Sequence, residues 1–575
     1  MNWRESYESW LNSPALSEAE WKELDSIRGN DKEIEDRFYA PLAFGTAGLR
    51  GVMGLGINRM NIHVIRHATQ AFAEVIAAEG QEAMDRGIVV CHDCRNNGVA
   101  FAREAAAIMA ANGIKVRIFD ALRPTPELSF AIRYYGAIAG INVTASHNPK
   151  EYNGYKVYWS DGAQLPPQHA EEIARRMEQN DIFRSPKTMD FDEAVSKGLI
   201  CFIGEETDEA FLSEVLAQAV NKETVAAVAD ELKIVFTPFH GCGWRLVPEA
   251  LKRLGIKHVY PVEEQMVLDG DFPTVKSPNP ENPEGFYLAV DLAKKVGSNL
   301  IIGTDPDADR VGVMVRRGDD FAVITGNQMG VLLLDYLITA RRETGKLPEN
   351  AAALTTIVST SMVRRICEVN GIHFDETFTG FKFMAEKLAE YKENNNSHQY
   401  ILAFEESYGY MVGDYVRDKD AITASMLIAE MAAYYAARKM TLLDALDELY
   451  SKYGVYQEET INLFMYGVDG LEQMRALMAS LRETPPTSIG GVNVTRVRDY
   501  KTGDIIIPGI GVVEKTAIVG SNVLYWELED GSAVVVRPSG TEPKIKMYIL
   551  ARADEMEVCK AKKAAMAAYA RSLAE

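Results

Sequence analysis

The segment from Val143 to Lys156 concentrates polar and turn-forming residues directly after an apolar run. That run, Ala137 to Ile141, predicts a buried strand, which would place Ser146 just past a strand end, where open α/β sheets bind their ligands. A loop of this composition can aim the serine hydroxyl at a ligand. A plain turn is the alternative, because Ser, Asn and Pro are common turn formers. Taken alone, the segment fits both interpretations.

A second loop carries three alternating carboxylates, Asp305, Asp307 and Asp309, between two apolar runs. In an extended loop this spacing puts them on one face, where they repel one another unless a hard cation such as Mg²⁺, Mn²⁺ or Ca²⁺ lies among them. A helix-loop-helix calcium site needs Gly and Glu where this sequence has Arg310 and Arg316. The loop therefore predicts a metal site, with a solvated acidic turn as the alternative.

A third segment, Val536 to Lys544, gathers groups that bind phosphate. The guanidinium of Arg537 presents a planar fork that matches phosphate oxygens, and backbone N–H groups around Gly540 can form an anion-binding concavity. Ser539 and Thr541 add hydroxyls. A hairpin turn is the alternative. In a fourth segment, Glu405 and Ser407 could accept hydrogen bonds from the neighbouring hydroxyls of a sugar.

Together these loops resemble those of the α-D-phosphohexomutase superfamily. Its members carry a serine loop of the T-A-S-H-N-P type, an Asp-rich metal loop, a glutamate-bearing sugar loop and an R-x-S-G-T phosphate loop, in this order. The resemblance extends from Phe44 to Tyr548. Further matching segments contain Arg50, Thr379 to Lys382, and Lys419.

The sugar loops resemble the glucose-type pattern more than the E-M-S pattern of phosphomannomutases. The loop Ser277 to Glu284 resembles the branch that includes bacterial phosphoglucomutases and phosphopentomutases. Phe404 departs from the glucose-type pattern, which has Gly before Glu-Glu-Ser. Phosphopentomutase and phosphomannomutase activity therefore stay open as alternatives.

The resemblance implies an isomerase that interconverts glucose 1-phosphate and glucose 6-phosphate. Phosphorylated Ser146 would transfer its phosphoryl group to the substrate, and glucose 1,6-bisphosphate, which also primes the enzyme, would return its other phosphate. Lys156 is the expected general acid and base, with His147 and Arg50 as helpers. One Mg²⁺ per chain would be held by Ser146, Asp305, Asp307 and Asp309. Expected substrate contacts are Arg310, Thr379, Gly380, Lys382, Glu405, Ser407, Lys419, Arg537, Ser539, Gly540 and Thr541.

Two other function classes compete with this reading. Asp305 and Asp307 after an apolar strand would also suit a metal-dependent sugar phosphatase with an aspartate nucleophile. A sugar-phosphate sensor without turnover is the other, although its expected signature, loss of the serine or of one aspartate, is missing.

Composition limits the partners and the compartment. The 575 residues carry a net charge of −21, which disfavours nucleic acid and anionic membranes as partners. The substrate is expected to be a small sugar phosphate, bound by a monomer or a homodimer. Six scattered cysteines predict a reducing, cytoplasmic setting. The first residues lack the basic start and apolar core expected of a signal peptide, and no apolar run of about 18 residues occurs in the sequence. Cys91-His-Asp-Cys94 has redox spacing, but the resemblance assigns Asp93 and Arg95 to supporting the serine loop.

Residues 1–40 predict one or two leading helices, and alternating strands and helices follow. The predicted fold is α/β, with three similar domains and a C-terminal α+β domain around a central cleft, as the resemblance implies. We expect domains at residues 1–220, 221–324, 325–452 and 453–575, bearing the serine, metal, sugar and phosphate loops in that order.

Overall fold

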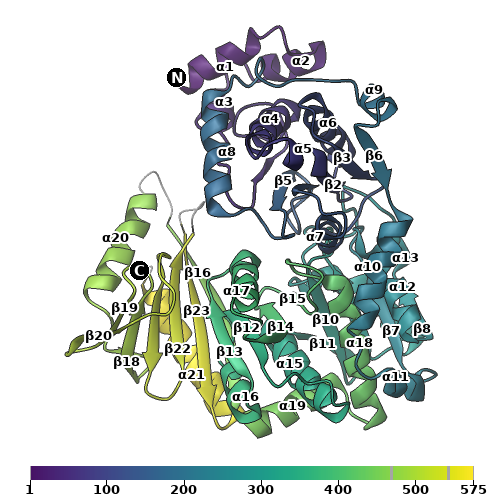
Figure 1. Ribbon diagram of the computed structural model, residues 1–575. Helices are drawn as coiled ribbons and strands as arrows, with labels where there is room; N and C mark the ends of the chain where they lie inside the picture. Colours follow the sequence, from purple (N-terminus) through teal and green to yellow (C-terminus); the bar gives the residue numbers. More distant parts are fainter. Residues whose placement is uncertain (1, 466–469, 540–543, 574–575) are drawn as a thin grey trace. The chain divides into compact units, whose positions relative to one another are not determined.

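The computed structural model describes residues 2–465, 470–539 and 544–573. Their contacts form two compact units (Figure 1). The first contains residues 1–324 and 408–437, and the second contains residues 325–407 and 438–575. Among the described helices, none is both long and apolar enough to cross a membrane.

The first unit starts with three helices where one or two were expected: α1 (Trp3–Leu11), α2 (Glu18–Ser26) and α3 (Asp31–Phe38). The side chains of Asn2, Ser17 and Asn30 each accept a hydrogen bond from a first-turn N–H group, so each helix has its own N-cap. Trp10 and Phe38 pack edge to face in the small core that joins them.

A six-stranded sheet follows, in the order β1-β5-β4-β2-β3-β6. The bounds are β1 (Leu49–Val52), β2 (Ile88–His92), β3 (Val116–Phe119), β4 (Ala139–Val143), β5 (Tyr152–Trp159) and β6 (Ile200–Ile203). β2, β3, β4 and β6 pair in parallel, whereas β5 pairs antiparallel with both β4 and β1. The accompanying helices are α4 (Ile62–Ala78), α5 (Gln81–Arg86), α6 (Gly98–Ala111), α7 (Thr125–Tyr134), α8 (Pro167–Gln179) and α9 (Phe191–Ser196).

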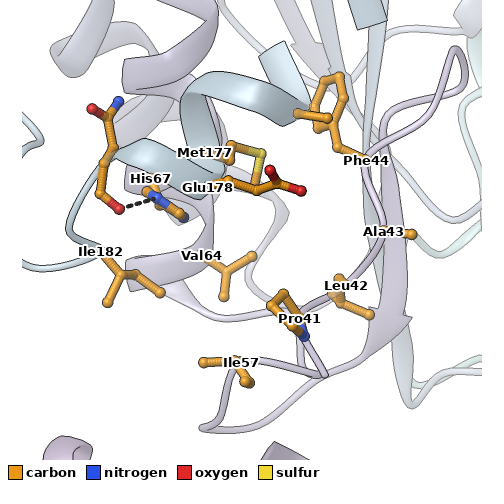
Figure 2. Close-up of a pocket in the computed structure, with 12 residues that line it drawn as sticks. Pro41, Leu42, Ala43, Phe44, Ile57, Val64, His67, Met177, Glu178 and Ile182 are labelled. Atoms are coloured by element: carbon orange, nitrogen blue, oxygen red, sulfur yellow. Dashed lines mark hydrogen bonds between the residues drawn. The ribbon is translucent and has the colours of Figure 1, made fainter. Parts of the chain in front are cut away.

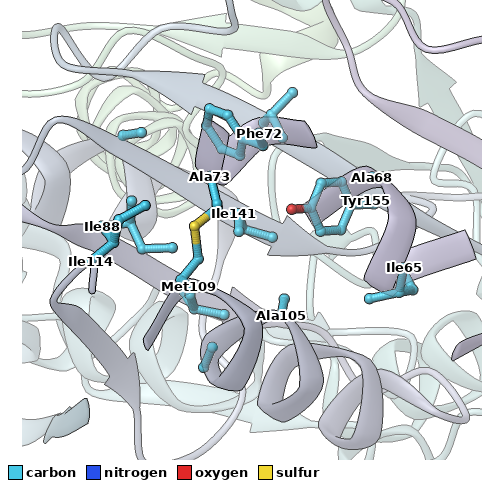
Figure 3. Close-up of a cluster of buried hydrophobic side chains, with 14 of the residues drawn as sticks. Ile65, Ala68, Phe72, Ala73, Ile88, Ala105, Met109, Ile114, Ile141 and Tyr155 are labelled. Atoms are coloured by element: carbon cyan, nitrogen blue, oxygen red, sulfur yellow. The ribbon is translucent and has the colours of Figure 1, made fainter. Parts of the chain in front are cut away.

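Strands β2 and β4 are buried along their whole length, which is typical of parallel strands covered on both faces. Figure 3 shows the core on one face, where Phe72, Met109, Ile141 and Tyr155 meet. This core fixes the strand ends from which the serine loop starts.

The second sheet of this unit has the order β11-β10-β9-β7-β8. Its strands are β7 (Lys233–Thr237), β8 (His258–Pro261), β9 (Leu300–Thr304), β10 (Val311–Arg317) and β11 (Asp320–Ile324). The helices are α10 (Glu205–Ala217), α11 (Lys222–Val228), α12 (Gly243–Leu254), α13 (Glu263–Met266), η1 (Pro283–Phe286) and α14 (Tyr287–Val296). From later in the chain, β15 (Gly409–Met411) and α18 (Ala421–Ala437) belong to this unit, and α18 packs on α11 and α12. The Asp-rich loop joins β9 to the antiparallel β10.

The second unit holds a parallel arrangement of β13 (His373–Thr377), β12 (Ala351–Thr356) and β14 (Gln399–Glu405). Its helices are α15 (Gly326–Glu343), α16 (Met362–Asn370), α17 (Phe381–Glu393) and α19 (Leu442–Tyr453). The sugar loops follow the carboxyl ends of β13 and β14.

An eight-stranded antiparallel sheet completes this unit. Its strands are β16 (Val455–Phe464), β17 (Ser488–Ile489), β18 (Val492–Asp499), β19 (Asp504–Ile507), β20 (Gly511–Lys515), β21 (Leu524–Leu528), β22 (Ala533–Pro538) and β23 (Lys544–Ala553). Two helices, α20 (Gly470–Glu483) and α21 (Met556–Ser572), accompany it. The predicted α+β character of this segment is confirmed.

One apolar cluster joins this sheet to the loops after β12 and β13. Ile357, Val358 and Phe378 from those loops pack with Val535 and Tyr548 of the sheet. An ion pair between Arg498 and Glu376, 3.5 Å apart, lies beside it. The two segments therefore share one core within the second unit.

Candidate functional site

The serine loop follows β4 directly, and Ser146 lies three residues after the strand ends at Val143. Asp93, just past β2, accepts a hydrogen bond from Thr144 Oγ1 at 2.6 Å, and Thr144 Oγ1 accepts one from Ser146 N at 2.9 Å. The guanidinium of Arg95 donates to four carbonyls of the loop, including that of Ser146 at 2.6 Å. Asp93 and Arg95 thus support the loop, as the resemblance implied.

Ser146 is buried and has a left-handed backbone, with φ of 51°. Few non-glycine residues adopt this region, and an instance at a loop tip that is fixed by hydrogen bonds is a sign of functional constraint. Its Oγ donates to Asp305 Oδ2 at 2.8 Å and lies 3.2 Å from His147 Nδ1. The structure therefore brings the serine hydroxyl directly to the Asp-rich loop.

The three aspartates form a compact buried group, with one carboxylate oxygen of each within 4.8 Å of the others. Asp305 Oδ1 accepts hydrogen bonds from the backbone N–H groups of Asp309 and Arg310. Asp307 Oδ1 and Asp309 Oδ1 are buried and have no hydrogen-bond partner among the described residues. Two unpartnered carboxylate oxygens within a cluster of hard oxygen donors fit a divalent cation.

Two buried lysines compensate the negative charge. Lys156 Nζ lies 2.6 Å from Asp307 Oδ2, and Lys419 Nζ lies 3.2 Å from Asp309 Oδ2 and 3.0 Å from Asp418 Oδ1. Burial alone would lower the pKa of Lys156, but the two aspartates beside it raise the pKa above its usual value. Lys156 is therefore a charged member of the site.

The surroundings of His147 favour its neutral form. Burial, together with the positive charges of Arg310 and Arg50, lowers the pKa of His147 well below its usual value. The neutral imidazole can exchange a hydrogen bond with the Ser146 hydroxyl, 3.2 Å from Nδ1. Arg50, which lies on β1, donates a hydrogen bond to Asn148 Oδ1 of the serine loop at 3.1 Å.

The loop Ser277 to Glu284 also contacts this site. Glu281 accepts a hydrogen bond from Arg310 Nη1 at 2.8 Å, and Ser277 Oγ donates to the His147 carbonyl at 3.3 Å. The loop that resembles one branch of the superfamily thus fixes the orientation of Arg310. Our sequence analysis did not assign a site role to Glu281.

In the second unit, the two sugar loops are connected. Gly380 N donates to Glu405 Oε1 at 2.5 Å, so the end of β13 is fixed to the end of β14. The neighbouring Glu406 accepts from Ser359 Oγ at 3.2 Å, just past β12. Thr379 and Ser407 are half-buried, and burial lowers the pKa of Lys382. The expected sugar residues of this unit, Thr379, Gly380, Lys382, Glu405 and Ser407, therefore lie at the carboxyl ends of two parallel strands, β13 and β14.

The phosphate loop follows β22. Arg537 and Tyr548 lie on one face of the sheet, where the Tyr548 hydroxyl oxygen accepts a hydrogen bond from Arg537. Burial raises the pKa of Tyr548, and the carboxylates of Glu406 and Glu405 raise it further, so the phosphate and sugar loops of this unit are neighbours. Ser539 N donates to the Lys544 carbonyl at 2.8 Å. The predicted Gly540 and Thr541 lie outside the described residues.

Comparison with known proteins assigns the family. Three descriptions match: phosphoglucomutase/phosphomannomutase alpha/beta/alpha domain I at residues 41–183, domain II at 209–318 and domain III at 325–453. The phosphoglucomutase of Staphylococcus haemolyticus is 36% identical over 530 residues, which cover 91% of this chain and 92% of that protein. The phosphoglucomutase of Staphylococcus aureus strain MRSA252 is 35% identical, with 90% and 91% covered. The chain belongs to the phosphoglucomutase/phosphomannomutase family.

Solved structures agree on the fold. The parafusin phosphoglucomutase of Paramecium, in an open form, superposes with a TM-score of 0.68 at 18% identity, covering 93% of this chain and 94% of that one. A phosphoglucomutase/phosphomannomutase family protein of Burkholderia thailandensis gives 0.65 at 19%, covering 92% and 97%. The predicted superfamily is confirmed: the chain is a phosphohexomutase, an isomerase that interconverts sugar phosphates, with three α/β/α domains followed by an antiparallel sheet domain.

Sequence reasoning missed two residues of this phosphohexomutase, Thr125, which contacts the Asp-rich loop, and Asn142, which contacts Thr125. Thr125 Oγ1 donates to Asp307 Oδ2 at 2.7 Å, and Asn142 Nδ2 donates to Thr125 Oγ1 at 2.8 Å. Both are fully buried. An asparagine inside the apolar run of β4 was the available signal, because a buried amide needs a polar partner.

The six cysteines differ in exposure. All six are free, with four buried, Cys94 half-buried and Cys201 exposed. Burial raises the pKa of the Cys91 and Cys94 thiols well above the usual value, which lowers their reactivity.

A cavity of about 470 Å³ lies apart from these loops in the first unit. Figure 2 shows its walls, which include Pro41, Leu42, Phe44, Val64 and Met177. His67 at its edge bonds the Asn180 carbonyl at 3.1 Å. Walls of this kind do not match the hydroxyls and charges of a sugar phosphate.

Proposed function

We propose that this phosphohexomutase interconverts glucose 1-phosphate and glucose 6-phosphate through a phosphorylated Ser146 and a glucose 1,6-bisphosphate intermediate. The observation that carries the proposal is the 2.8 Å contact between Ser146 Oγ and Asp305 Oδ2. A hydroxyl placed against three aspartates and two lysines can bear a phosphoryl group whose charge the surrounding cations neutralise.

The reaction consists of two matched transfers. In the first, the bond between Ser146 Oγ and phosphorus breaks while a sugar hydroxyl forms a new bond to phosphorus, and the hydroxyl proton passes to Ser146 Oγ. Lys156 is the proposed acid and base for this proton, with neutral His147 and Arg50 assisting. After the bisphosphate turns around, its other phosphoryl group returns to Ser146 by the reverse exchange.

The metal that we propose is Mg²⁺, one per chain. Asp305, Asp307 and Asp309 would hold it together with the phosphate on Ser146, and their buried oxygens fit a hard cation. When bound, the ion neutralises charge on the transferring phosphoryl group. Support comes from N-acetylphosphoglucosamine mutase of Aspergillus fumigatus, which was crystallised with GlcNAc-6P and magnesium and shares the fold at a TM-score of 0.50.

The substrate contacts are proposed from the loops of each unit. Arg310 and Lys419 in the first unit, and Thr379, Gly380, Lys382, Glu405 and Ser407 in the second, would bind the sugar. Arg537, Ser539, Gly540 and Thr541 would hold the phosphate that is not being transferred. The preference for glucose rests on the names of the relatives and on the resemblance of the sugar loops. Initial rates with the 1-phosphates of glucose, mannose and ribose test it, and faster turnover of ribose 1-phosphate would point to a phosphopentomutase.

Intact mass of the purified protein tests the phosphoserine directly. After priming with glucose 1,6-bisphosphate, the wild type should gain one phosphate, and Ser146→Ala should gain none and lose mutase turnover. Hydroxylamine separates the alternatives, because it destroys an aspartyl phosphate and leaves a phosphoserine. A hydroxylamine-sensitive label, or substantial turnover in Ser146→Ala, would favour the phosphatase class.

The assembly as monomer or homodimer and the four domain boundaries stay predictions.

A further inference from the structure

Behind the metal loop, Asn142, Thr125 and Asp307 form a chain of hydrogen bonds. Asn142 Nδ2 donates to Thr125 Oγ1 at 2.8 Å, and Thr125 Oγ1 donates to Asp307 Oδ2 at 2.7 Å. A backbone bond parallels it, from Thr125 N to the Asp307 carbonyl at 2.9 Å. All three side chains are completely buried, so water does not replace these contacts.

The direction of this chain follows from the groups themselves. A carboxylate only accepts hydrogen bonds, so the single proton of the Thr125 hydroxyl must point to Asp307. The hydroxyl oxygen is then an acceptor toward Asn142, which must present its NH₂ group. If the amide were turned around, its oxygen would compete with Asp307 for the same proton. Asn142 therefore fixes the direction in which Thr125 donates.

The sheet explains why these groups meet. Asn142 on β4 is paired with Cys91 of β2 on one side and with Lys156 of β5 on the other. Thr125 is the first residue of α7, and its backbone is bonded to the metal loop. The outcome is that Asp307 Oδ2 accepts two hydrogen bonds, from Thr125 and Lys156, whereas Asp307 Oδ1 has no partner among the described residues.

We propose that Thr125 and Asn142 are positioning residues that hold Asp307 in the rotamer in which Oδ1 faces the divalent cation. This inference rests on the proposed metal site. Lys156 alone cannot fix the Asp307 rotamer, because its ammonium group also lies 3.4 Å from Asp309 Oδ2 and its four-carbon side chain is flexible. Thr125, in contrast, is hydrogen-bonded to Asp307 through both its backbone and its side chain. Hydrogen-bond partners of this kind orient metal ligands, and their loss typically lowers metal affinity about 10–100-fold.

The test is direct binding of Mn²⁺ to the full-length, dephosphorylated protein, followed by the free-Mn²⁺ electron paramagnetic resonance signal and by calorimetry. Thr125→Val removes the hydroxyl while keeping the shape, and it should weaken Mn²⁺ binding about 10–100-fold. Thr125→Ser restores the donor and should bind within a few-fold of wild type. The matched control is Thr69→Val, which removes another fully buried hydroxyl of this unit, one bonded to Tyr155, and should bind Mn²⁺ like wild type.

Asp307→Asn separates failure of the inference from failure of the metal site. If wild type binds Mn²⁺ and Asp307→Asn does not, the site is correct, and equal binding by Thr125→Val then overturns the positioning role alone. If wild type binds no Mn²⁺, both ideas fail.

Thermal melts of every variant report on folding. Should Thr125→Val not fold, Asn142→Leu takes its place, because it removes only the outer link and lets the Thr125 hydroxyl rotate. It should weaken Mn²⁺ binding more than Thr69→Val does, and binding equal to that control would contradict the proposal.

Discussion

Ser146 is held in a backbone conformation that few side chains accept. Its φ of 51° is compatible with a serine that is fixed by Thr144 and Arg95, but a β-branched residue is strained there. The backbone therefore disfavours β-branched residues such as threonine at this position, although threonine also carries a hydroxyl.

Ser146→Thr tests this selection. Threonine keeps a hydroxyl, yet the strain should cost about 1–3 kcal/mol and move Oγ away from Asp305. We expect Ser146→Thr to have lower thermal stability than Ser146→Ala. Its phosphorylation by glucose 1,6-bisphosphate should be at least about 100-fold slower than that of wild type, which corresponds to an activation barrier higher by about 3 kcal/mol. The measurement is intact mass against time, with melting curves of both variants. A threonine variant that is phosphorylated at the wild-type rate would show that the backbone does not discriminate.

Arg537 has a role that can be isolated from the transfer itself. Arg537→Ala should lower kcat/KM by about 2 kcal/mol, mostly through KM, because a charged hydrogen bond to phosphate is lost. Ser146 should still become phosphorylated when the variant is primed with excess bisphosphate. Steady-state kinetics and intact mass give the two readings, and unchanged kinetics would remove Arg537 from substrate binding.

At the scale of elements, helix α7 connects several parts of the first unit. Thr125 at its start donates to the metal loop, and Ser129 donates to the Gly162 carbonyl and accepts from Arg417 N. Between them, Glu127 is fully buried, and neither of its oxygens accepts a hydrogen bond from a described residue. Burial raises the pKa of Glu127 to about 8, although Arg123 lies 3.9 Å away, because Arg123 donates to Asp208 instead. The other charges that act on it are Arg245, Asp120 and Asp420.

This buried carboxyl predicts a pH dependence of stability. The unfolded chain releases the proton near pH 4.5, whereas the folded chain keeps it to about pH 8. The contribution of Glu127 to stability is therefore complete below pH 4.5 and decreases as pH rises to about 8, by at most about 1.4 kcal/mol per pH unit. Glu127→Gln should gain apparent Tm relative to wild type between pH 5 and pH 8. Glu178→Gln, at an exposed carboxylate of α8, is the control, and parallel Tm curves for Glu127→Gln and wild type would refute the prediction.

The sequence allowed the strands around the site to be predicted, because β2, β4 and β9 are continuous apolar runs and the polar loops follow them directly. Contacts between distant segments could not be predicted. Thr125 and Asp307 are 182 positions apart, and nothing in either local pattern links them. The association of α18 with the first unit was equally hidden, since an almost uniformly buried helix carries no stripe that identifies its neighbours.

At the scale of the whole molecule, the second unit depends on a core shared between its two segments. Ile357, Val358 and Phe378 are covered by the face of the C-terminal sheet that carries Val535 and Tyr548. The expected fourth domain is thus packed against the third through apolar surface, in addition to the ion pair of Arg498 with Glu376.

A chain that ends at Tyr453 should expose this surface. We expect the truncated protein to bind a hydrophobic dye such as anilinonaphthalene sulfonate, to melt at lower temperature and to self-associate, because contiguous apolar patches promote association. Dye fluorescence and size-exclusion chromatography measure this. The milder variant Arg498→Ala, which removes the contacts of Arg498 with Glu376, Glu527 and the Tyr525 ring but leaves the C-terminal sheet in place, should stay monodisperse. A truncated chain that is monodisperse and melts like the full protein would show that the shared core is dispensable.

The uneven exposure of the thiols has a practical consequence for spectroscopy. Cys201 lies on β6, at the edge of the first sheet, and is the one exposed thiol among six cysteines that are all described. A maleimide fluorophore should therefore attach with a stoichiometry near one to the unmodified sequence, with slow further reaction at half-buried Cys94. The label would lie on β6, at the opposite side of the sheet from β5. A second dye, on a cysteine introduced into the second unit, would then allow the distance between the two units to be followed during turnover.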